Sequence, residues 1–339
     1  MKGGFVMRML LAIIVLGASL WSGYWLVSSR GIEAEFSRWF DARRADGWVA
    51  ETGTLGVQGF PNRFDTVFTD LALADPRTGL AWEAPRFEIN TLSYRPNHVI
   101  AVWPERQLIA TPREKFLIES SDMRASLVFA PDSALAPRRV TLTAELLRVT
   151  PLARAGETTA LSALTLAAER LEGTEYRLGL RAEGLALAAP WRALLDPENR
   201  LPRQVSGARA DLTVTFDKPW DRSAVERARP QPTRIKVALA DGRWGDLHLQ
   251  AAGTVEVDAQ GYPVGEITLK ARNWREIVTL MRVAGMLPES LAESVESGLG
   301  MMARLAGNPE TLDIPLGFGS GRVWLGPVPL GPAPVLRLR

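Results

Sequence analysis

A period-two alternation of apolar and polar residues limits the fold of this chain more than any other feature of the sequence. A β-strand directs successive side chains to opposite faces, so each alternating segment has one apolar and one polar face. Segments of this kind that follow one another through short turns predict an antiparallel meander. The clearest segments are residues 208–216, 234–239, 247–258 and 266–270, with turns at Asp241–Gly242 and Gln260–Gly261.

The rest of the chain favours the same fold class. Similar segments, interrupted by Pro and Gly turns, fill residues 64–187, and residues 321–336 return to short strands. The repeated helices that parallel βαβ units need do not occur between them. The sequence therefore predicts a mainly β protein, built as a long antiparallel meander.

One helical hairpin, at about residues 274–306, interrupts the strands. Asn273 is a typical N-cap residue, and Glu276 stands three positions later, as in a capping box. Two apolar stripes with helical spacing follow, and we expect them to pack on the sheet. If the sheet holds a ligand, this hairpin is its predicted lid, through Ile277, Met281, Leu291, Val295 and Met302.

An apolar run without ionisable side chains, Met9–Val27, lies near the N-terminus between Arg8 and Arg30. Its 19 residues would form a helix of about 28 Å, close to the thickness of the bilayer hydrocarbon. Aromatic rings near one end of a span settle at the membrane–water interface. The predicted interfacial anchors are Trp21, Tyr24 and Trp25.

A cleaved secretory signal is the alternative to a retained anchor, since Gly17, Ala18 and Ser19 loosely resemble a cleavage site. The run continues past these residues for a full span, which favours the retained anchor. The positive-inside rule then predicts a single span with residues 1–8 in the cytoplasm. We expect an anchor at 9–27, a juxtamembrane helix within 28–47 that caps the body, and one elongated periplasmic body at 48–339.

Composition excludes several classes of function. The chain has no cysteine, so it forms no disulfide and holds no thiolate metal site. Its 40 Lys and Arg against 38 Asp and Glu give a net charge of +2, without the basic surplus typical of nucleic-acid binding. We therefore expect no nucleic-acid partner, and a membrane as the main partner.

Catalytic motifs are also missing from the sequence. His98 and His248 are the only histidines, and neither belongs to an HExxH zinc motif. A G-x-S-x-G nucleophile elbow does not occur. The sequence predicts no catalytic residue, no metal, no cofactor and no enzymatic activity.

The apolar face of the meander is the remaining candidate site. It is either a groove that accommodates a lipid acyl chain or an ordinary dry core, and apolar stripes are more often core. Methionines near the helical hairpin suit a flexible apolar lid. The predicted groove residues are Leu212, Val214, Phe216, Ile235, Val237, Leu249, Val255 and Ile267.

Short motifs in the chain resemble bacterial envelope proteins. The segment GTVEVDAQGYPVGEITLK (253–270) resembles a strand pair of AsmA-like proteins. The wider layout is more similar to the uncharacterised bacterial envelope family called domain of unknown function 2125. That layout joins an N-terminal span to an early Gly59–Pro61 turn, the Asp241–Gly242 turn and a closing GPVPLGPAPVL.

The resemblance covers most of the chain and brings no catalytic residues with it. AsmA-like relatives imply curled sheets with an apolar interior and a link to envelope lipid homeostasis. The first hypothesis is thus a non-enzymatic protein of the bacterial inner membrane that handles envelope lipids. A structural or assembly scaffold with a dry core is the second hypothesis, and an envelope hydrolase is the third and least favoured.

Overall fold

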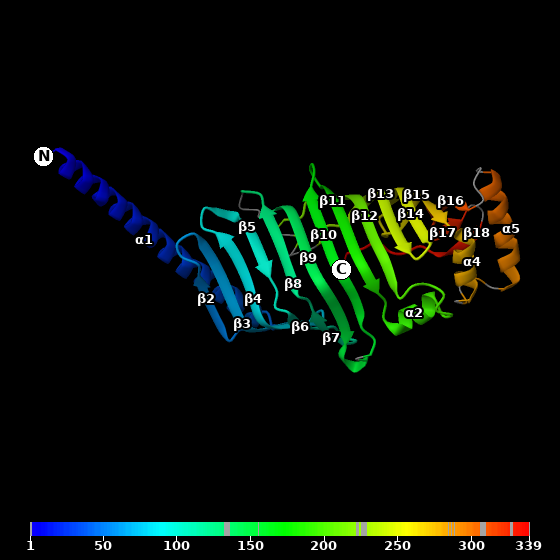
Figure 1. Cartoon of the computed structure of the whole chain (residues 1–339), viewed down its shortest axis with the longest axis horizontal. Coiled ribbons are helices and arrows are strands. Elements are labelled where there is room, and N and C mark those ends of the chain that lie inside the picture. The colour runs from blue at the N-terminus through cyan, green and yellow to red at the C-terminus, as the bar shows by residue number, and fades with distance from the viewer. Residues whose placement is uncertain are drawn as a thin grey trace. The chain divides into compact units, whose positions relative to one another are not determined.

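The computed structural model of the chain is shown in Figure 1. It describes residues 2–131, 136–154, 156–221, 224, 229–283, 285, 287, 289–305, 310–325 and 328–338. The chain packs as two compact units. Unit 1 comprises Met1–Leu117 with Arg124–Ser126, and unit 2 comprises Ile118–Met123 with Leu127–Arg339.

Unit 1 consists of one long helix and a group of antiparallel strands. β3 pairs with β1, β2 and β4, and β4 pairs with β5 and β6. The elements that lie wholly in unit 1 are α1 (Lys2–Ala45), β1 (Val49–Glu51), β2 (Thr54–Gln58), β3 (Arg63–Asp75), β4 (Leu80–Leu92), β5 (Arg95–Val102) and β6 (Arg106–Ala110).

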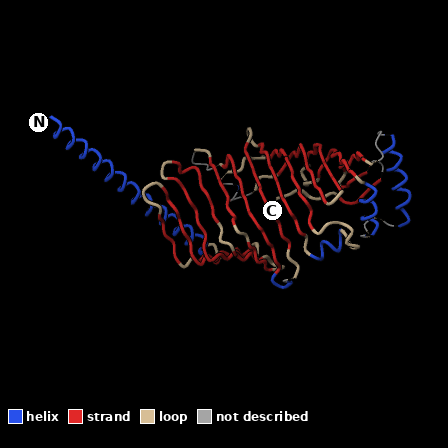
Figure 2. The backbone as a smooth tube through the Cα atoms, in the orientation of Figure 1, coloured by secondary structure: helices blue, strands red, loops and turns tan. Residues whose placement is uncertain are grey.

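Unit 2 contains the longer run of strands, drawn red in Figure 2, together with its helices. Its elements are β9 (Pro137–Pro151), η1 (Leu152–Arg154), β10 (Thr159–Arg170), β11 (Glu175–Ala186), α2 (Ala189–Leu195), β12 (Gln204–Phe216), β13 (Pro232–Trp244), β14 (Leu247–Val257), β15 (Pro263–Arg272), α4 (Trp274–Val283), α5 (Glu289–Leu305), β16 (Thr311–Gly319), β17 (Arg322–Leu325) and β18 (Val328–Pro332). β7 (Lys115–Glu119) and β8 (Asp122–Phe129) each have residues in both units.

Each strand from β9 to β18 pairs antiparallel with the next strand along the chain. The described residues therefore confirm the predicted mainly β fold with a large antiparallel meander. The pair α4–α5 and the long apolar N-terminal helix are confirmed as well. The single periplasmic body and the membrane topology stay predictions.

One predicted turn is wrong. Asp241 and Gly242 lie within β13, where they pair with Gln250 and Leu249, and the chain reverses later, at Gly245–Asp246. The strand continues because the buried Asp241 carboxylate is satisfied by side chains of the next strand. The turn expected at Gln260–Gly261 is confirmed.

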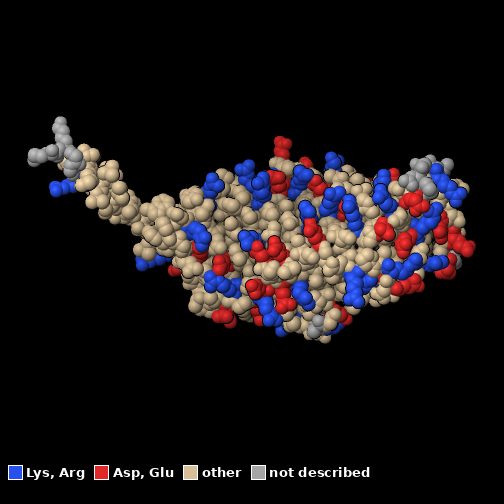
Figure 3. Space-filling model, viewed as in Figure 1, with Lys and Arg blue, Asp and Glu red and all other residues tan. Residues whose placement is uncertain are grey.

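The polar face of unit 2 is crossed by ion pairs between neighbouring strands. Arg139 and Glu169 stand opposite each other on β9 and β10, with their charged atoms 2.7 Å apart. The hydrogen bond from Arg139 lowers the pKa of Glu169. Arg234 and Glu256 form the same kind of pair on β13 and β14, at 2.6 Å. Positive and negative side chains therefore alternate on the surface in Figure 3 instead of forming one-sign patches.

α1 is one continuous helix instead of a span followed by a separate juxtamembrane helix. Gly31 does not break it, since a single helical glycine costs only about 1 kcal/mol. Beyond the apolar run, Phe36 and Phe40 pack against Phe68 and Leu71 of β3, so this part of α1 caps unit 1 as expected. Phe5–Ala45 is long and apolar enough to cross a membrane, and its most apolar window is not buried.

The helix pair α4–α5 packs on the ends of β15 and β16. Trp274 is the centre of this cluster, with only 2% of its surface exposed, and it contacts Ala271, Leu299 and Leu312. The hairpin therefore supports this end of the sheet.

We predict that Trp274→Ala lowers the free energy of unfolding by about 3–5 kcal/mol, because it leaves a cavity in this cluster. Urea unfolding of the full chain in mild detergent measures the change. Trp191→Ala is the matched control, since Trp191 is 59% exposed on α2 and its loss should change stability little. Equal effects of the two substitutions would contradict the assignment of Trp274 to the core.

Candidate functional site

The strand register of unit 2 gathers apolar residues into rows across one face of the sheet. One row crosses eight neighbouring strands, from β9 to β16. It consists of Val140, Ala168, Leu178, Leu212, Val237, Gly253, Ile267 and Leu316. At about 4.8 Å per strand, the row is about 34 Å wide.

A second row lies two residues further along each strand. It consists of Arg170, Tyr176, Val214, Ile235, Val255, Gly265 and Phe318, from β10 to β16. The two rows together contain six of the eight predicted groove residues. Leu249 lies on the same face, in the row of Ala271 and Leu312.

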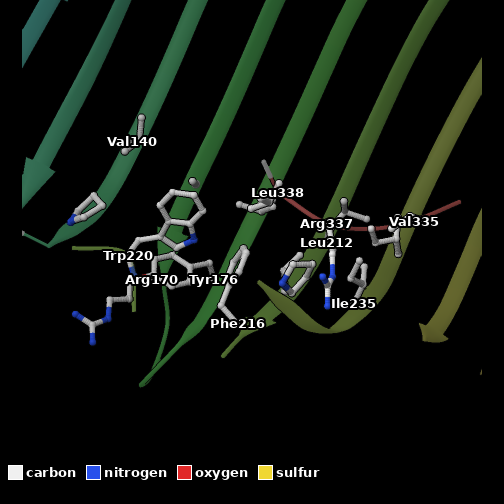
Figure 4. A pocket seen from close by; sticks show the side chains of 16 residues that line it. Val140, Arg170, Tyr176, Leu212, Phe216, Trp220, Ile235, Val335, Arg337 and Leu338 are labelled. Atoms are coloured by element: carbon white, nitrogen blue, oxygen red, sulfur yellow. The ribbon is translucent and has the colours of Figure 1, made fainter. Parts of the chain in front are cut away.

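A cavity of about 670 Å³ opens on this face where the strands β9 to β13 meet the last described residues of the chain (Figure 4). Ligand pockets of proteins usually measure about 300–1,000 Å³. The lining is almost wholly apolar. It consists of Pro137, Val140, Ala168, Arg170, Tyr176, Leu178, Leu212, Val214, Phe216, Trp220, Pro232, Ile235 and Val335–Leu338.

An aromatic cluster forms one wall of the cavity. The ring of Phe216 meets Tyr176 at 5.7 Å and Trp220 at 5.6 Å, both edge to face. The Tyr176 hydroxyl accepts a hydrogen bond from the backbone N–H of Trp220 at 3.0 Å. This bond satisfies the polar tip of Tyr176, so its ring faces the cavity without an unpaired hydroxyl.

The C-terminal segment Val335–Leu338 forms a second wall. Leu336 donates its N–H to the carbonyl oxygen of Gly261 at 2.7 Å. Leu338 exchanges two hydrogen bonds with the side chain of Gln231, each 3.0 Å long. The segment is thus held by backbone and amide groups, while apolar side chains line the cavity.

Two arginines are the charged residues among the described lining. Arg170 belongs to an otherwise apolar row, and its Nε donates to the carbonyl oxygen of Gly173 at 3.0 Å. Arg337 donates to the carbonyl oxygen of Ala259. A guanidinium has five N–H donors, so each retains donors for an anionic ligand group.

Only half of the eight predicted groove residues line this cavity in the part of the chain that the structure describes. Leu212, Val214, Phe216 and Ile235 line the cavity. The other four, Val237, Leu249, Val255 and Ile267, share its sheet face but are not among the residues described as lining it.

The predicted lid residues do not appear among the described lining of this cavity. Ile277 and Val295 pack in the cluster around Trp274 instead, and Met281 and Met302 are exposed. The side chain of Leu291 lies outside the described residues. Trp220 and the C-terminal segment line the cavity instead of the helices α4 and α5 that were predicted to cover it.

Unit 1 has an apolar cavity of its own, of about 430 Å³, between α1 and the β3–β4 hairpin. Aromatic rings dominate it, and Glu35 stands among them as the charged residue of the described lining. The other lining residues are Phe36, Trp39, Phe40, Phe68, Leu71, Leu73, Trp82, Phe87 and Ile89.

The predicted interfacial anchors contact unit 1 through their polar atoms. Each of the three rings donates a hydrogen bond to a backbone carbonyl oxygen of unit 1, in a turn or at the first residue of a strand. The pairs are Trp21 to Pro61 at 3.0 Å, Tyr24 to Ser93 at 3.1 Å, and Trp25 to Arg63 at 2.8 Å.

Neither histidine lies among the described lining of the two apolar cavities. His98 Nε2 lies 2.8 Å from the hydroxyl of Ser126, and His248 Nε2 lies 2.5 Å from Asp241 Oδ2. Among the residues that the structure describes, no three His, Cys, Asp or Glu side chains are placed to hold a metal ion.

Asp241 gives unit 2 a pH-dependent contribution to stability. The hydrogen bond with His248 lowers the pKa of Asp241, and burial opposes this effect. A carboxylate with a lowered pKa stabilises the fold fully above its unfolded pKa, near 3.9, and loses this contribution as the pH falls further.

We predict that Asp241→Asn lowers the free energy of unfolding by about 1 kcal/mol at pH 7. The difference from the unmodified chain should shrink as the pH falls below about 4, because the Asp241 carboxyl group of the unfolded chain then takes up a proton before that of the folded chain. Urea unfolding at pH 7, 5 and 3 measures it. Asp217→Asn, an exposed Asp after β12, is the control, and a difference that stays constant over this range would contradict the prediction.

Sequence reasoning missed Arg170, Trp220 and the C-terminal segment. Arg170 ends an alternating segment in phase with Leu166 and Ala168, a signal that was present in the sequence. The Trp220 loop and the C-terminal segment have no periodicity, and tertiary contacts alone bring them to the cavity.

A protein-family model matches most of the chain. No curated protein matches the chain at a significant level. The model of the family described as "Uncharacterized protein conserved in bacteria (DUF2125)" matches residues 25–334, which is most of the chain and includes every element from β1 to β18. The AsmA-like resemblance of residues 253–270 stays a prediction. The chain belongs to the family of uncharacterized proteins conserved in bacteria, DUF2125.

Proposed function

We propose that this protein is a non-enzymatic lipid-handling protein of the bacterial envelope that binds an acyl chain in the unit 2 cavity. The observation that carries the proposal is the apolar cavity of about 670 Å³ on the face of the unit 2 sheet that carries the two apolar rows. Its lining offers aliphatic and aromatic surface to a ligand. Each methylene group that leaves water for such a surface contributes about 0.8 kcal/mol.

The two arginines at the cavity favour an acyl chain that ends in an anionic group. Arg170 stands where the apolar row would otherwise continue, so a carboxylate or phosphate beside it would have its hydrocarbon chain along Leu178 and Leu212. A guanidinium matches the oxygens of either group in a bidentate arrangement.

The N-terminal helix supports the location in the envelope. An exposed apolar helix of this length suits retention in the inner membrane, and Arg8 on its N-terminal side favours a cytoplasmic N-terminus with the strands in the periplasm. Permanent attachment beside a bilayer suits a protein whose ligand is a membrane lipid.

We predict that Leu212→Asp weakens the binding of a long-chain fatty acid at least about tenfold, because it places a charge in the apolar cavity. The full chain in lipid vesicles is irradiated with a photoreactive fatty acid, and mass spectrometry locates the crosslinks. In the unmodified chain we expect crosslinks on the cavity walls, around Phe216 and Val335–Leu338.

Thr213→Asp is the matched control, since Thr213 adjoins Leu212 on the same strand but stands opposite Arg177 on the polar face. It should leave the crosslinks unchanged. A chain that folds normally and acquires no crosslink in the cavity would contradict lipid binding and favour the scaffold with a dry core.

We further predict that Arg170→Gln weakens the binding of the fatty acid about two- to fivefold, the effect of one solvent-accessible ion pair. Binding of the corresponding methyl ester, which lacks the charge, should not change. Crosslinking titrations with both ligands measure the difference. Arg181→Gln, on the polar face beside Glu183, is the control, and an equal loss for acid and ester would exclude recognition of the anionic group.

A further inference from the structure

Two turns of unit 1 lie beside the helix α1 at the end of its apolar run. The first is Gly59–Arg63, which connects β2 to β3 and includes the first residue of β3, and the second is Ser93–Tyr94, between β4 and β5. We call them together the tip. The three hydrogen bonds from Trp21, Tyr24 and Trp25 all end on carbonyl oxygens of the tip.

These hydrogen bonds fix the position of the tip along the axis of α1. Trp21 precedes Val27, the last residue of the apolar run, by six positions, or about 9 Å of helix. Trp21 bonds directly to Pro61 at 3.0 Å. A membrane that covers the apolar run therefore reaches the level of the tip.

The exposed surface of the tip has the chemistry of a membrane interface. Phe60 is 54% exposed and Tyr94 is 61% exposed, although both are large aromatic residues. The ring of Phe60 meets Trp25 at 5.5 Å, so it continues the aromatic group of α1. Tyr and Trp rings settle among lipid headgroups, and Phe side chains insert at the boundary between the headgroups and the acyl chains.

Charge at the tip fits the same surroundings. Arg63, at the end of the first turn, and Arg95, directly after the second turn, are both exposed. Asp65, the nearby acid, is buried and is paired with Arg63. Guanidinium groups bind lipid phosphates well, and long arginine side chains extend toward them from a neighbouring apolar surface.

We infer that the tip is a second membrane contact, inserted into the headgroup layer of the bilayer that α1 crosses. Phe60 and Tyr94 lie among the headgroups, and the arginines bind phosphates. The partner is the lipid surface itself, because the tip is continuous with the apolar surface of the helix. This inference rests on the proposed anchoring by α1 and is independent of the cavity in unit 2.

The lack of cysteine allows a direct test, since a single introduced cysteine is the only site that a thiol-reactive dye can label. Phe60→Cys and Tyr94→Cys are labelled with an environment-sensitive fluorophore in the full chain. The chain is reconstituted into phosphatidylcholine–phosphatidylglycerol vesicles that carry a nitroxide quencher either near the headgroup or deep in the acyl chain.

Two further labelled variants are the controls. Arg77→Cys lies at the opposite end of the β3–β4 hairpin, about 40 Å along the strand from Arg63. Leu16→Cys lies within the apolar run. We expect the shallow quencher to quench both tip labels several-fold more than the label at position 77. The deep quencher should quench the label at position 16 most.

The outcomes separate the inference from the proposal on which it rests. If the Leu16 label is quenched but both tip labels behave like the Arg77 label, α1 is an anchor and the membrane contact of the tip is wrong. If the Leu16 label is not quenched either, the proposed anchoring fails, and the inference fails with it.

Discussion

The cross-strand register of unit 2 is the constraint on which its other features depend. Side chains on a strand alternate between faces, so a slip of one residue would move every apolar side chain to the polar face. The same register that aligns Leu178 with Leu212 also places Arg139 opposite Glu169 on the other face. The ion pairs and the apolar rows are therefore two results of one alignment, and the cavity exists only while that alignment holds.

Much of this architecture could be predicted from the sequence, because alternation is a local signal. The antiparallel strands, the helix pair and the apolar face could be predicted from it. Leu212, Val214 and Ile235 were predicted as groove residues only from their positions in the alternation of apolar and polar residues. The turn expected at Asp241–Gly242 was wrong because His248 and Gln250 satisfy the Asp241 carboxylate, and this contact is between strands. The walls at Trp220 and Val335–Leu338 depend on tertiary packing, which no local pattern encodes.

The predicted helical lid illustrates a similar limit. An amphipathic stripe shows that a helix packs on something, but it does not identify the surface that it covers. Ile277 and Val295 pack around Trp274, at the ends of β15 and β16, while the cavity lies along β9 to β13. The hairpin lies where Trp274 packs with Ala271 and Leu312 of the two strands, and the methionines near it were no guide.

The uninterrupted helix α1 has a mechanical consequence. The helix Lys2–Ala45 has no break between its apolar run and its C-terminal part, which packs on the strands of unit 1. Three hydrogen bonds from aromatic rings also join the apolar run to the tip. If the apolar run crosses a membrane as proposed, it and unit 1 must tilt together as one rigid body. A helix adjusts to a thinner bilayer by tilting, so the thickness of the surrounding lipid would set the angle at which the first strands stand above it.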